Sequence, residues 1–177
     1  MNQIFDRQRL REIDEGVMRS IQAGRRNCLN PIVIALTHLG GGVIWWAWYV
    51  LIFIKTEDKT ALLYLSAAFF SAWLLSSKVM KRIFRRPRAY DAMEGLIPLI
   101  RRPKDSAFPS AHAACAFSAA CAIAFTRSSA EGALALILAV LVGYSRIYVG
   151  VHYLTDVIGG AFTGFCCASL AYMLFFF

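Results

Sequence analysis

The chain has 177 residues, a net charge of +8 and a hydrophobic content of 58%, with a mean hydropathy of +0.53. Its length suits one domain, but its apolar residues come in blocks too long and too numerous for a soluble protein. Because the basic residues lie beside these blocks, lipid head groups are more suitable partners than nucleic acid. We therefore expect an all-α fold, a polytopic membrane helix bundle.

The N-terminal region, residues 1–30, is charged rather than apolar, yet it has a helical pattern. Leu10, Ile13, Val17 and Ile21 recur at three- or four-residue spacing among arginines and acids. Such a pattern predicts an amphipathic helix that lies in the membrane interface. The alternative is a helix that packs against the protein's own loops.

Five apolar segments follow, each close in length to the roughly 20 residues that cross the hydrocarbon of a bilayer. We predict membrane spans at residues 31–54, 60–80, 109–126, 132–148 and 153–177. The third is the shortest, and the glycines at 40–42 predict a kink or a close contact in the first. Residues 1–177 are thus expected to form a single membrane domain, in which the interfacial segment precedes a transmembrane bundle, residues 31–177.

Alternate crossings by these spans place the polar segments on two sides of the membrane. Residues 81–108, residues 145–152 and the N-terminal region fall on one side, whereas the turns at 55–59 and 127–131 fall on the other. The segments with the most unusual polar residues are therefore expected to meet at one membrane surface. Small residues that recur in the third span, and Gly160 and Gly164 in the fifth, predict close helix packing.

The sequence SRIYVGVHYLTD, residues 145–156, separates the last two apolar segments. His152 and Asp156 are four residues apart, so on a helix they share a face. The carboxylate can then accept from one imidazole nitrogen and leave the other free as a base or nucleophile. Such pairs are also common structural contacts, but ionisable groups at the end of a membrane span are costly and usually functional.

His112 lies at the start of the third span, behind Pro109 and Ser110. Proline suits the first turn of a helix, where free backbone N–H groups form an anion site to which a serine hydroxyl can add a donor. A histidine in that turn is well placed to give a proton to a leaving oxygen. Taken alone, Ser110 is better explained as a plain helix cap.

Cationic side chains gather on the same predicted side of the membrane: Lys81, Arg82, Arg85, Arg86, Arg88 and Arg146. The planar fork of arginine matches phosphate oxygens. For Arg82, Arg85 and Arg86 we favour attraction to the lipid surface. Arg146 stands alone in an apolar context six residues before a histidine, and we expect a functional role for it.

These residues together predict a phosphoryl-transfer site at one membrane face. We expect no metal and no other cofactor, because too few acids accompany the histidines to hold two metal ions and arginines crowd the place of a divalent cation. The five cysteines show no metal-site spacing and are expected to be small buried thiols.

At these residues the sequence resembles the type-2 phosphatidic acid phosphatase superfamily of integral-membrane lipid phosphate phosphatases. The family pattern is Lys-x6-Arg-Pro, then Pro-Ser-Gly-His, then Ser-Arg-x5-His-x3-Asp. The matching residues are Lys81 and Arg88, then Pro109, Ser110 and His112, then Ser145, Arg146, His152 and Asp156. These motifs occupy residues 81–156, a little under half of the chain, and the third is matched in full.

The resemblance implies a role for each matched residue. His152 would be the nucleophile and form a phosphohistidine, Asp156 would orient it, and His112 would protonate the leaving lipid oxygen and then activate water. The phosphate oxygens would be held by Lys81, Arg88, Ser110, Arg146 and the backbone N–H of Ala111.

Three departures from the family pattern stand out. Ala89 replaces the proline after Arg88, which removes no phosphate donor. Ala111 replaces a glycine, and only glycine freely adopts positive φ. Many family members have six spans, whereas five are predicted here, with the N-terminal helix in place of the first.

The leading prediction is a metal-independent phosphatase that cleaves a phosphomonoester or diphosphate of a membrane lipid. Phosphatidic acid, phosphatidylglycerol phosphate, a polyprenyl phosphate or diphosphate, and a phosphorylated glycolipid are all suitable substrates, and short loops mildly favour small head groups. Two alternatives stay open: a phosphoryl transferase acting between lipids, and a non-hydrolytic lipid-phosphate binding or transport protein. The sequence predicts no oligomeric state.

The expected location is a bacterial cytoplasmic (inner) membrane. The resemblance implies an active site on the extracytoplasmic face, whereas the positive-inside rule favours the cytoplasmic face, because six arginines precede the first span. Catalytic cations distort that count, and we expect the extracytoplasmic orientation.

Overall fold

The structure is a computed structural model that describes residues 2–177, with side chains described for residues 8–38 and 40–177. Every regular element in the described part is helical. The helices are α1 (Asn2–Ala23), α2 (Asn30–Leu39), α3 (Val43–Thr56), α4 (Lys59–Leu74), the π-helical segment η1 (Leu75–Met80), α5 (Lys81–Phe84), α6 (Ala89–Ala92), α7 (Ala111–Thr126), α8 (Ser129–Tyr148) and α9 (Leu154–Phe176). The predicted all-α bundle is confirmed.

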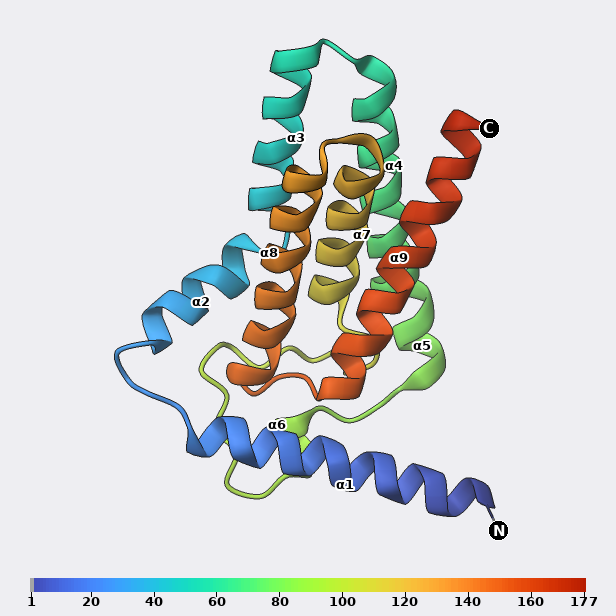
Figure 1. Cartoon of the computed structure of the whole chain (residues 1–177). Helices are drawn as coiled ribbons and strands as arrows, with labels where there is room; N and C mark the ends of the chain where they lie inside the picture. The colour runs from blue at the N-terminus through green and yellow to red at the C-terminus, as the bar shows by residue number, and fades with distance from the viewer. Residues whose placement is uncertain (1) are drawn as a thin grey trace.

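Helix α7 is the centre of the bundle, and α4, α8 and α9 pack around it (Figure 1). Its alanine-rich sequence lets neighbours approach to backbone contact. A Cβ on Gly164 would lie 2.3 Å from the carbonyl oxygen of Ala114, and one on Gly160 would lie 2.5 Å from that of Ser110. The close packing predicted for these glycines is therefore confirmed, and it fixes the start of α7 against α9.

The spans differ in part from the five predicted. Within residues 2–177, three helical stretches can cross a bilayer by length and composition: Lys59–Ala92, Ser129–Tyr148 and Leu154–Phe176. The predicted first span is two helices, α2 and α3, bent by 57° at the glycines, and the pair counts as a fourth span only if taken together. Helix α7 has only 16 residues, but its surroundings are other helices, so its length need not match the hydrocarbon.

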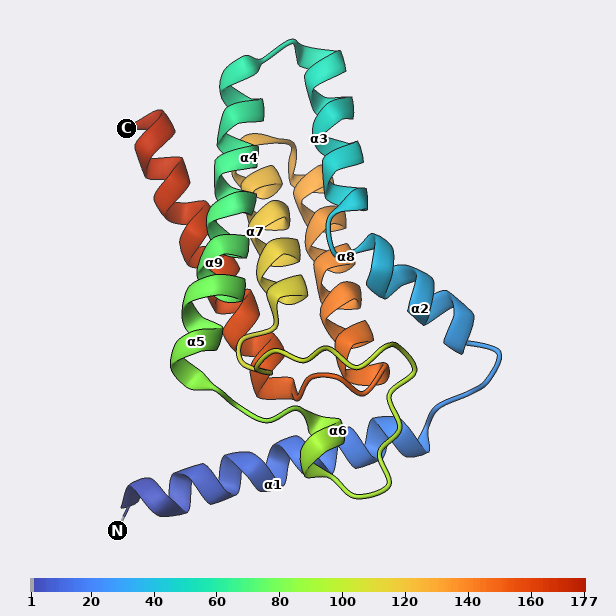
Figure 2. The ribbon, with the colours of Figure 1, turned by 180° about the vertical axis from the view of Figure 1, so that it is seen from behind.

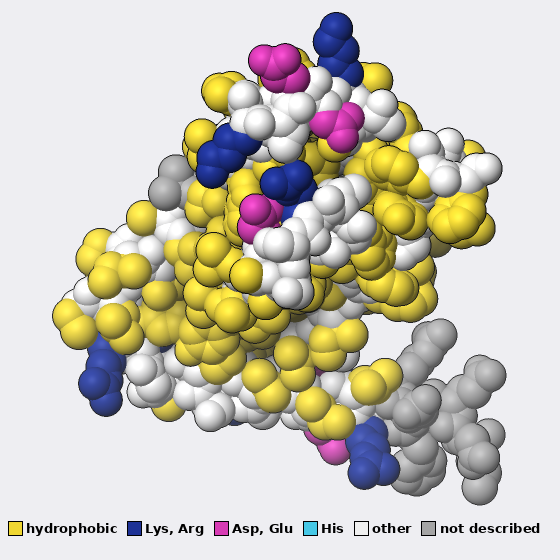
Figure 3. Space-filling model, turned by 45° about the horizontal axis from the view of Figure 1, so that its top comes forward, with side chains coloured by type: hydrophobic (Ala, Val, Ile, Leu, Met, Phe, Trp, Pro, Cys, Tyr) yellow, Lys and Arg dark blue, Asp and Glu magenta, His cyan; other side chains and the backbone are white. Residues whose placement is uncertain are grey.

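The surface of the bundle is largely apolar. Large hydrophobic side chains such as Ile54, Leu63, Ile137 and Leu170 are exposed on its outer helices. On the face in Figure 3 hydrophobic side chains predominate, and most of the charged ones gather in the upper part of the view. A surface of this kind is suited to lipid rather than water.

Helix α1 lies across one end of the bundle (Figures 1 and 2). It contacts α8 and α9 through a face on which Asp14 and Met18 are buried. Leu10 and Ile13, on another face, remain 46% exposed. The helix therefore packs on the protein with one face, although against helices rather than the loops of the alternative prediction, and keeps Leu10 and Ile13 exposed on another face.

The loop after α5, the start of α7 and the α8–α9 connection all meet at the end of the bundle that α1 crosses (Figure 2). The α3–α4 and α7–α8 turns lie at the opposite end. The predicted sorting of polar segments onto two sides is thus confirmed, and the motif residues come together at the α1 end.

Candidate active site

A cavity of about 260 Å³ opens at this end of the bundle. Its lining includes most of the predicted site residues: Lys81, Arg88, Ala111, His112, Arg146 and His152, together with Gly41, Trp73, Ser77, Pro103, Asp105 and Cys115. Residues from α4, η1, α5, α7 and α8 and from four connecting segments thus converge on one space. Asp156 and Ser110 are fully buried and do not line this cavity.

His152 follows Gly150, whose φ of +83° turns the chain between α8 and α9. The imidazole is 1% exposed, and its Nδ1 lies 3.6 Å from Oδ2 of Asp156. The backbone N–H of Tyr153 donates to the same oxygen at 2.9 Å and so fixes the carboxylate at the first turn of α9. Nδ1 therefore faces the acid, and Nε2 is the nitrogen on the other side of the ring.

The environment of His152 favours its neutral form. Burial, followed by the positive charges of Arg88 and Arg146, lowers the pKa of this imidazole well below its ordinary 6.5. Neutral imidazole is the form that a nucleophile requires. The ring is therefore neutral at neutral pH, as the predicted nucleophilic role of His152 requires.

Two of the predicted phosphate-binding cations are held by one carboxylate. Lys81 Nζ lies 2.6 Å from Oδ2 of Asp105, and Arg88 Nη2 lies 2.6 Å from Oδ1. Partial burial alone would raise the pKa of Asp105, but its hydrogen bonds and charge interactions with Lys81 and Arg88 lower it to about 2. Asp105 is thus ionised at any physiological pH, and a phosphate must share or take over the donors that it occupies.

Arg88 also reaches the reacting nitrogen. Its Nη1 lies 3.2 Å from Nε2 of His152 and donates to the carbonyl oxygen of Val151 at 3.0 Å. A phosphorus atom attacked by Nε2 would therefore have a guanidinium beside it from the start. This contact supports the predicted role of Arg88 in holding a phosphate oxygen.

Arg146 enters the cavity from the end of α8 and is 4% exposed. Its Nη1 donates to the hydroxyl of Thr37 on α2 at 2.7 Å, whereas its buried Nε has no partner. A buried guanidinium with an unused donor is costly unless an anion completes it. The unpartnered Nε supports the predicted phosphate-binding role of Arg146, and Thr37 holds the guanidinium in place.

The start of α7 bears out the capping alternative for Ser110. Its hydroxyl accepts from the N–H of Ala113, and its own N–H donates to the carbonyl oxygen of Asp156 at 2.9 Å. Ala111 is the first residue of α7 and is not among the described residues with positive φ, so the departure from glycine causes no strain. Ala89 likewise begins α6, a position that needs no proline.

Sequence reasoning missed four residues around the site. Thr37 and Asp105 accept hydrogen bonds from cations predicted to bind phosphate, and Gly41 borders His112. For Arg86 we had favoured a lipid-surface role, but its Nη1 donates to Oδ1 of Asp156 at 2.7 Å. That interpretation is wrong for Arg86. The only sequence signal was its position directly before Pro87 and Arg88.

The sequence that forms this site also matches a known protein family. The profile of the PAP2 superfamily matches residues 59–177. The chain belongs to the PAP2 superfamily. The match covers every residue of the predicted site, so the family predicted from the motifs is confirmed.

Individual relatives agree with this assignment. An undecaprenyl-diphosphatase of Sulfolobus acidocaldarius is 31% identical over 77% of this chain and 66% of its own length. Phosphatidylglycerophosphatase B of Bacillus subtilis is 31% identical over 92% of this chain and 80% of its own. The crystal structure of LpxE from Aquifex aeolicus superposes with a TM-score of 0.79, at 25% identity, over 90% of this chain and 94% of that one.

The predicted class, a lipid phosphatase in an integral-membrane helix bundle, is confirmed at the level of the PAP2 family. The roles of individual residues, the substrate and the side of the membrane remain predictions. In the described part of the chain no three His, Cys, Asp or Glu side chains cluster as metal ligands would. The expected independence of metal is left to experiment.

The glycine break between α2 and α3 borders His112. A Cβ on Gly41 would lie 2.8 Å from Nε2 of His112, whereas one on Gly42 would meet nothing closer than 3.8 Å. We expect Gly41→Ala to displace the imidazole and lower kcat by about 10- to 100-fold, because small misplacements of a catalytic group are costly. Gly42→Ala is the matched control. Steady-state kinetics in detergent check this, and equal activity of the two variants would contradict it.

Proposed function

We propose that this protein is a phosphatase that removes the terminal phosphate of a membrane lipid through a phosphohistidine at His152. The observation that carries the proposal is the placing of Nε2 of His152. Asp156 lies behind the ring, and Arg88 lies 3.2 Å from Nε2. Lys81 and Arg146 line the same cavity. This arrangement supports attack on a phosphorus atom held by three cations.

In the first step Nε2 of His152 attacks phosphorus, and the bond from phosphorus to the lipid oxygen breaks. Arg88, Lys81 and Arg146 balance the charge on the phosphoryl oxygens, and Asp156 stabilises the positive imidazole. His112, in its protonated form, gives its proton to the leaving oxygen. The products are a free lipid alcohol, or a lipid monophosphate from a diphosphate, and phosphorylated His152.

In the second step the phosphoryl group passes to water. His112, now neutral, accepts a proton from a water molecule as that water attacks phosphorus. The phosphorus–nitrogen bond breaks, inorganic phosphate leaves and His152 returns to its starting form. The same histidine thus acts as acid and then as base, and the two steps restore the enzyme.

The substrate class follows from the surroundings of the cavity. The site lies at one end of an apolar bundle, at the level of the interfacial helix α1, where lipid head groups lie. A cavity of about 260 Å³ has room for a phosphate or diphosphate. We therefore propose a lipid that ends in a phosphate or diphosphate, the class to which phosphatidic acid, phosphatidylglycerol phosphate and polyprenyl diphosphates belong.

A phosphate-release assay tests this proposal. The purified protein is given phosphatidic acid, phosphatidylglycerol phosphate, undecaprenyl diphosphate and a lipid A phosphate in mixed micelles, with and without EDTA. We expect release from at least one of the first three, unchanged by EDTA, with no added acceptor. No release from any lipid, or loss of activity in EDTA, would count against a metal-independent hydrolase.

We also propose that the protein lies in the cytoplasmic membrane with its active site on the extracytoplasmic face. The support is the family resemblance, since the charge distribution favours the opposite side. The same assay tests this: intact cells receive a water-soluble, short-chain substrate that cannot cross the membrane. Hydrolysis without permeabilisation is expected, and activity that requires permeabilisation would place the site inside.

A further inference from the structure

Behind His152 a chain of charged groups, two buried acids and a half-buried arginine between them, runs out of the active site to the N-terminal helix. Its members alternate in sign: Asp156 on α9, Arg86 in the loop after α5, and Asp14 on α1. Asp156 and Asp14 are 0% and 1% exposed. Buried charges without a structural or functional role are rare because their desolvation is costly, so this chain calls for an explanation.

Both carboxylate oxygens of Asp14 accept hydrogen bonds from the protein, unlike those of a typical acid on an interfacial helix. Its Oδ1 accepts from the backbone N–H of Thr155 at 2.9 Å, and its Oδ2 accepts from the hydroxyl of Thr155 at 2.5 Å. The same Oδ2 accepts from Nη2 of Arg86 at 2.7 Å. Thr155 directly precedes the catalytic acid, so Asp14 holds the first turn of α9 from outside.

Arg86 links the two acids with separate nitrogens of one guanidinium. Nη2 donates to Asp14, while Nη1 donates to Oδ1 of Asp156 and to the hydroxyl of Thr155, both at 2.7 Å. The guanidinium carbon also lies 4.7 Å from the ring centroid of Tyr153. Oδ1 of Asp156 is thereby fixed by Arg86, which leaves Oδ2 directed at His152.

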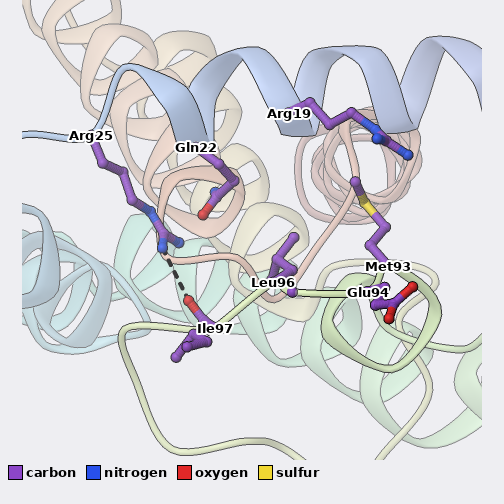
Figure 4. A pocket seen from close by; sticks show the side chains of 8 residues that line it. Arg19, Gln22, Arg25, Met93, Glu94, Leu96 and Ile97 are labelled. Carbon is purple, nitrogen blue, oxygen red and sulfur yellow. Dashed lines mark hydrogen bonds between the residues drawn. The ribbon is translucent and has the colours of Figure 1, made fainter.

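A second set of contacts anchors the C-terminal end of α1. Arg25 donates from Nε and Nη2 to the carbonyl oxygen of Tyr148, at the end of α8, and from Nη1 to that of Ile97. Figure 4 shows this end of the helix, with Arg25 directed at Ile97 and Gln22 beside it over a pocket of about 380 Å³. Nε, Nη1 and Nη2 of Arg25 all donate to backbone carbonyls. The contact therefore anchors the helix and is not a ligand site.

We infer that Asp14 and Arg86 are positioning residues for catalysis, and that α1 is part of the active-site support. Asp14 offsets the charge of Arg86, so that Arg86 can hold Asp156 without drawing its carboxylate away from Nδ1 of His152. The helix that keeps Leu10 and Ile13 exposed for the membrane interface therefore also orients His152, the proposed nucleophile. This inference rests on the proposed function, in which His152 attacks phosphorus.

The test uses Asp14→Asn and Arg86→Lys in the full-length protein. Asparagine keeps the shape but not the charge, and lysine keeps the charge but cannot donate to both acids from two fixed nitrogens. We expect each variant to lower kcat by about 10- to 100-fold, with the double variant no worse than the poorer single one. The Ki for inorganic phosphate should stay within about twofold, because Lys81, Arg88 and Arg146 are untouched.

Matched controls are Glu12→Gln on the exposed face of α1 and Arg82→Lys in the exposed turn of α5. Both should keep wild-type kcat and Ki. The inference is overturned if Asp14→Asn and Arg86→Lys match their controls, or if kcat and phosphate affinity fall in parallel as they would on general loosening. Activity that survives in His152→Gln would instead refute the proposed function, so the two failures are distinguishable.

Discussion

Replacement of His152 by glutamine is expected to abolish phosphate release, with kcat at least about 10⁴-fold lower. Glutamine has a similar size and can still hydrogen-bond, but its amide cannot form a covalent bond to phosphorus under these conditions. The three cations remain, so the variant should still bind phosphate. The phosphate-release assay gives kcat, and inhibition by inorganic phosphate gives binding.

His38 provides the control for this variant. It is the chain's third histidine, exposed on α2, with its Nδ1 2.7 Å from the carbonyl oxygen of Ile34. His38→Gln should keep wild-type kcat to within about twofold, because the side chain is exposed and does not line the cavity. Turnover by His152→Gln within tenfold of the wild type would rule out a nucleophilic role for His152.

Replacement of His112 by asparagine is expected to lower kcat on lipid substrates by about 10³-fold, within the range of general acid–base catalysis. The loss should depend on the leaving group. p-Nitrophenolate leaves without a proton, so the first step should be largely restored with p-nitrophenyl phosphate, whereas the attack of water remains slow.

Rapid-mixing kinetics separate these two steps. His112→Asn should release a burst of p-nitrophenol equal to the amount of enzyme, followed by slow turnover. An absent burst with a uniformly slow first step would mean that His112 does not act as the acid. Unchanged activity on lipids would remove it from the mechanism.

Much of this site was predictable because it depends on local sequence. Apolar blocks predict the bundle, and the four-residue spacing of His152 and Asp156 predicts their shared place at the start of α9. The spacing does not predict which of the three arginines Arg82, Arg85 and Arg86 contacts Asp156. Arg85 has a φ of 43° and ends α5, so the chain reverses there and carries Arg86 toward Asp156.

The burial of Asp14 could not be predicted from the sequence either. In an amphipathic pattern an acid beside Ile13 is expected on the solvated face, and its partner Thr155 is 141 residues away. The break in the first span and the short α7 were also only partly predictable. A helix surrounded by protein can be short, and a span can bend at glycines, because neighbouring helices rather than lipid determine its limits.

The measurement that tests the central claim most directly is the trapping of the phosphoenzyme. His112→Asn is mixed with ³²P-labelled substrate that has a good leaving group, quenched within the burst phase and analysed on denaturing gels. We predict about one label per chain, stable in alkali, lost in acid and absent from the His112→Asn/His152→Gln double variant. A label that survives acid, a label that persists without His152, or no label during a confirmed burst would contradict the account.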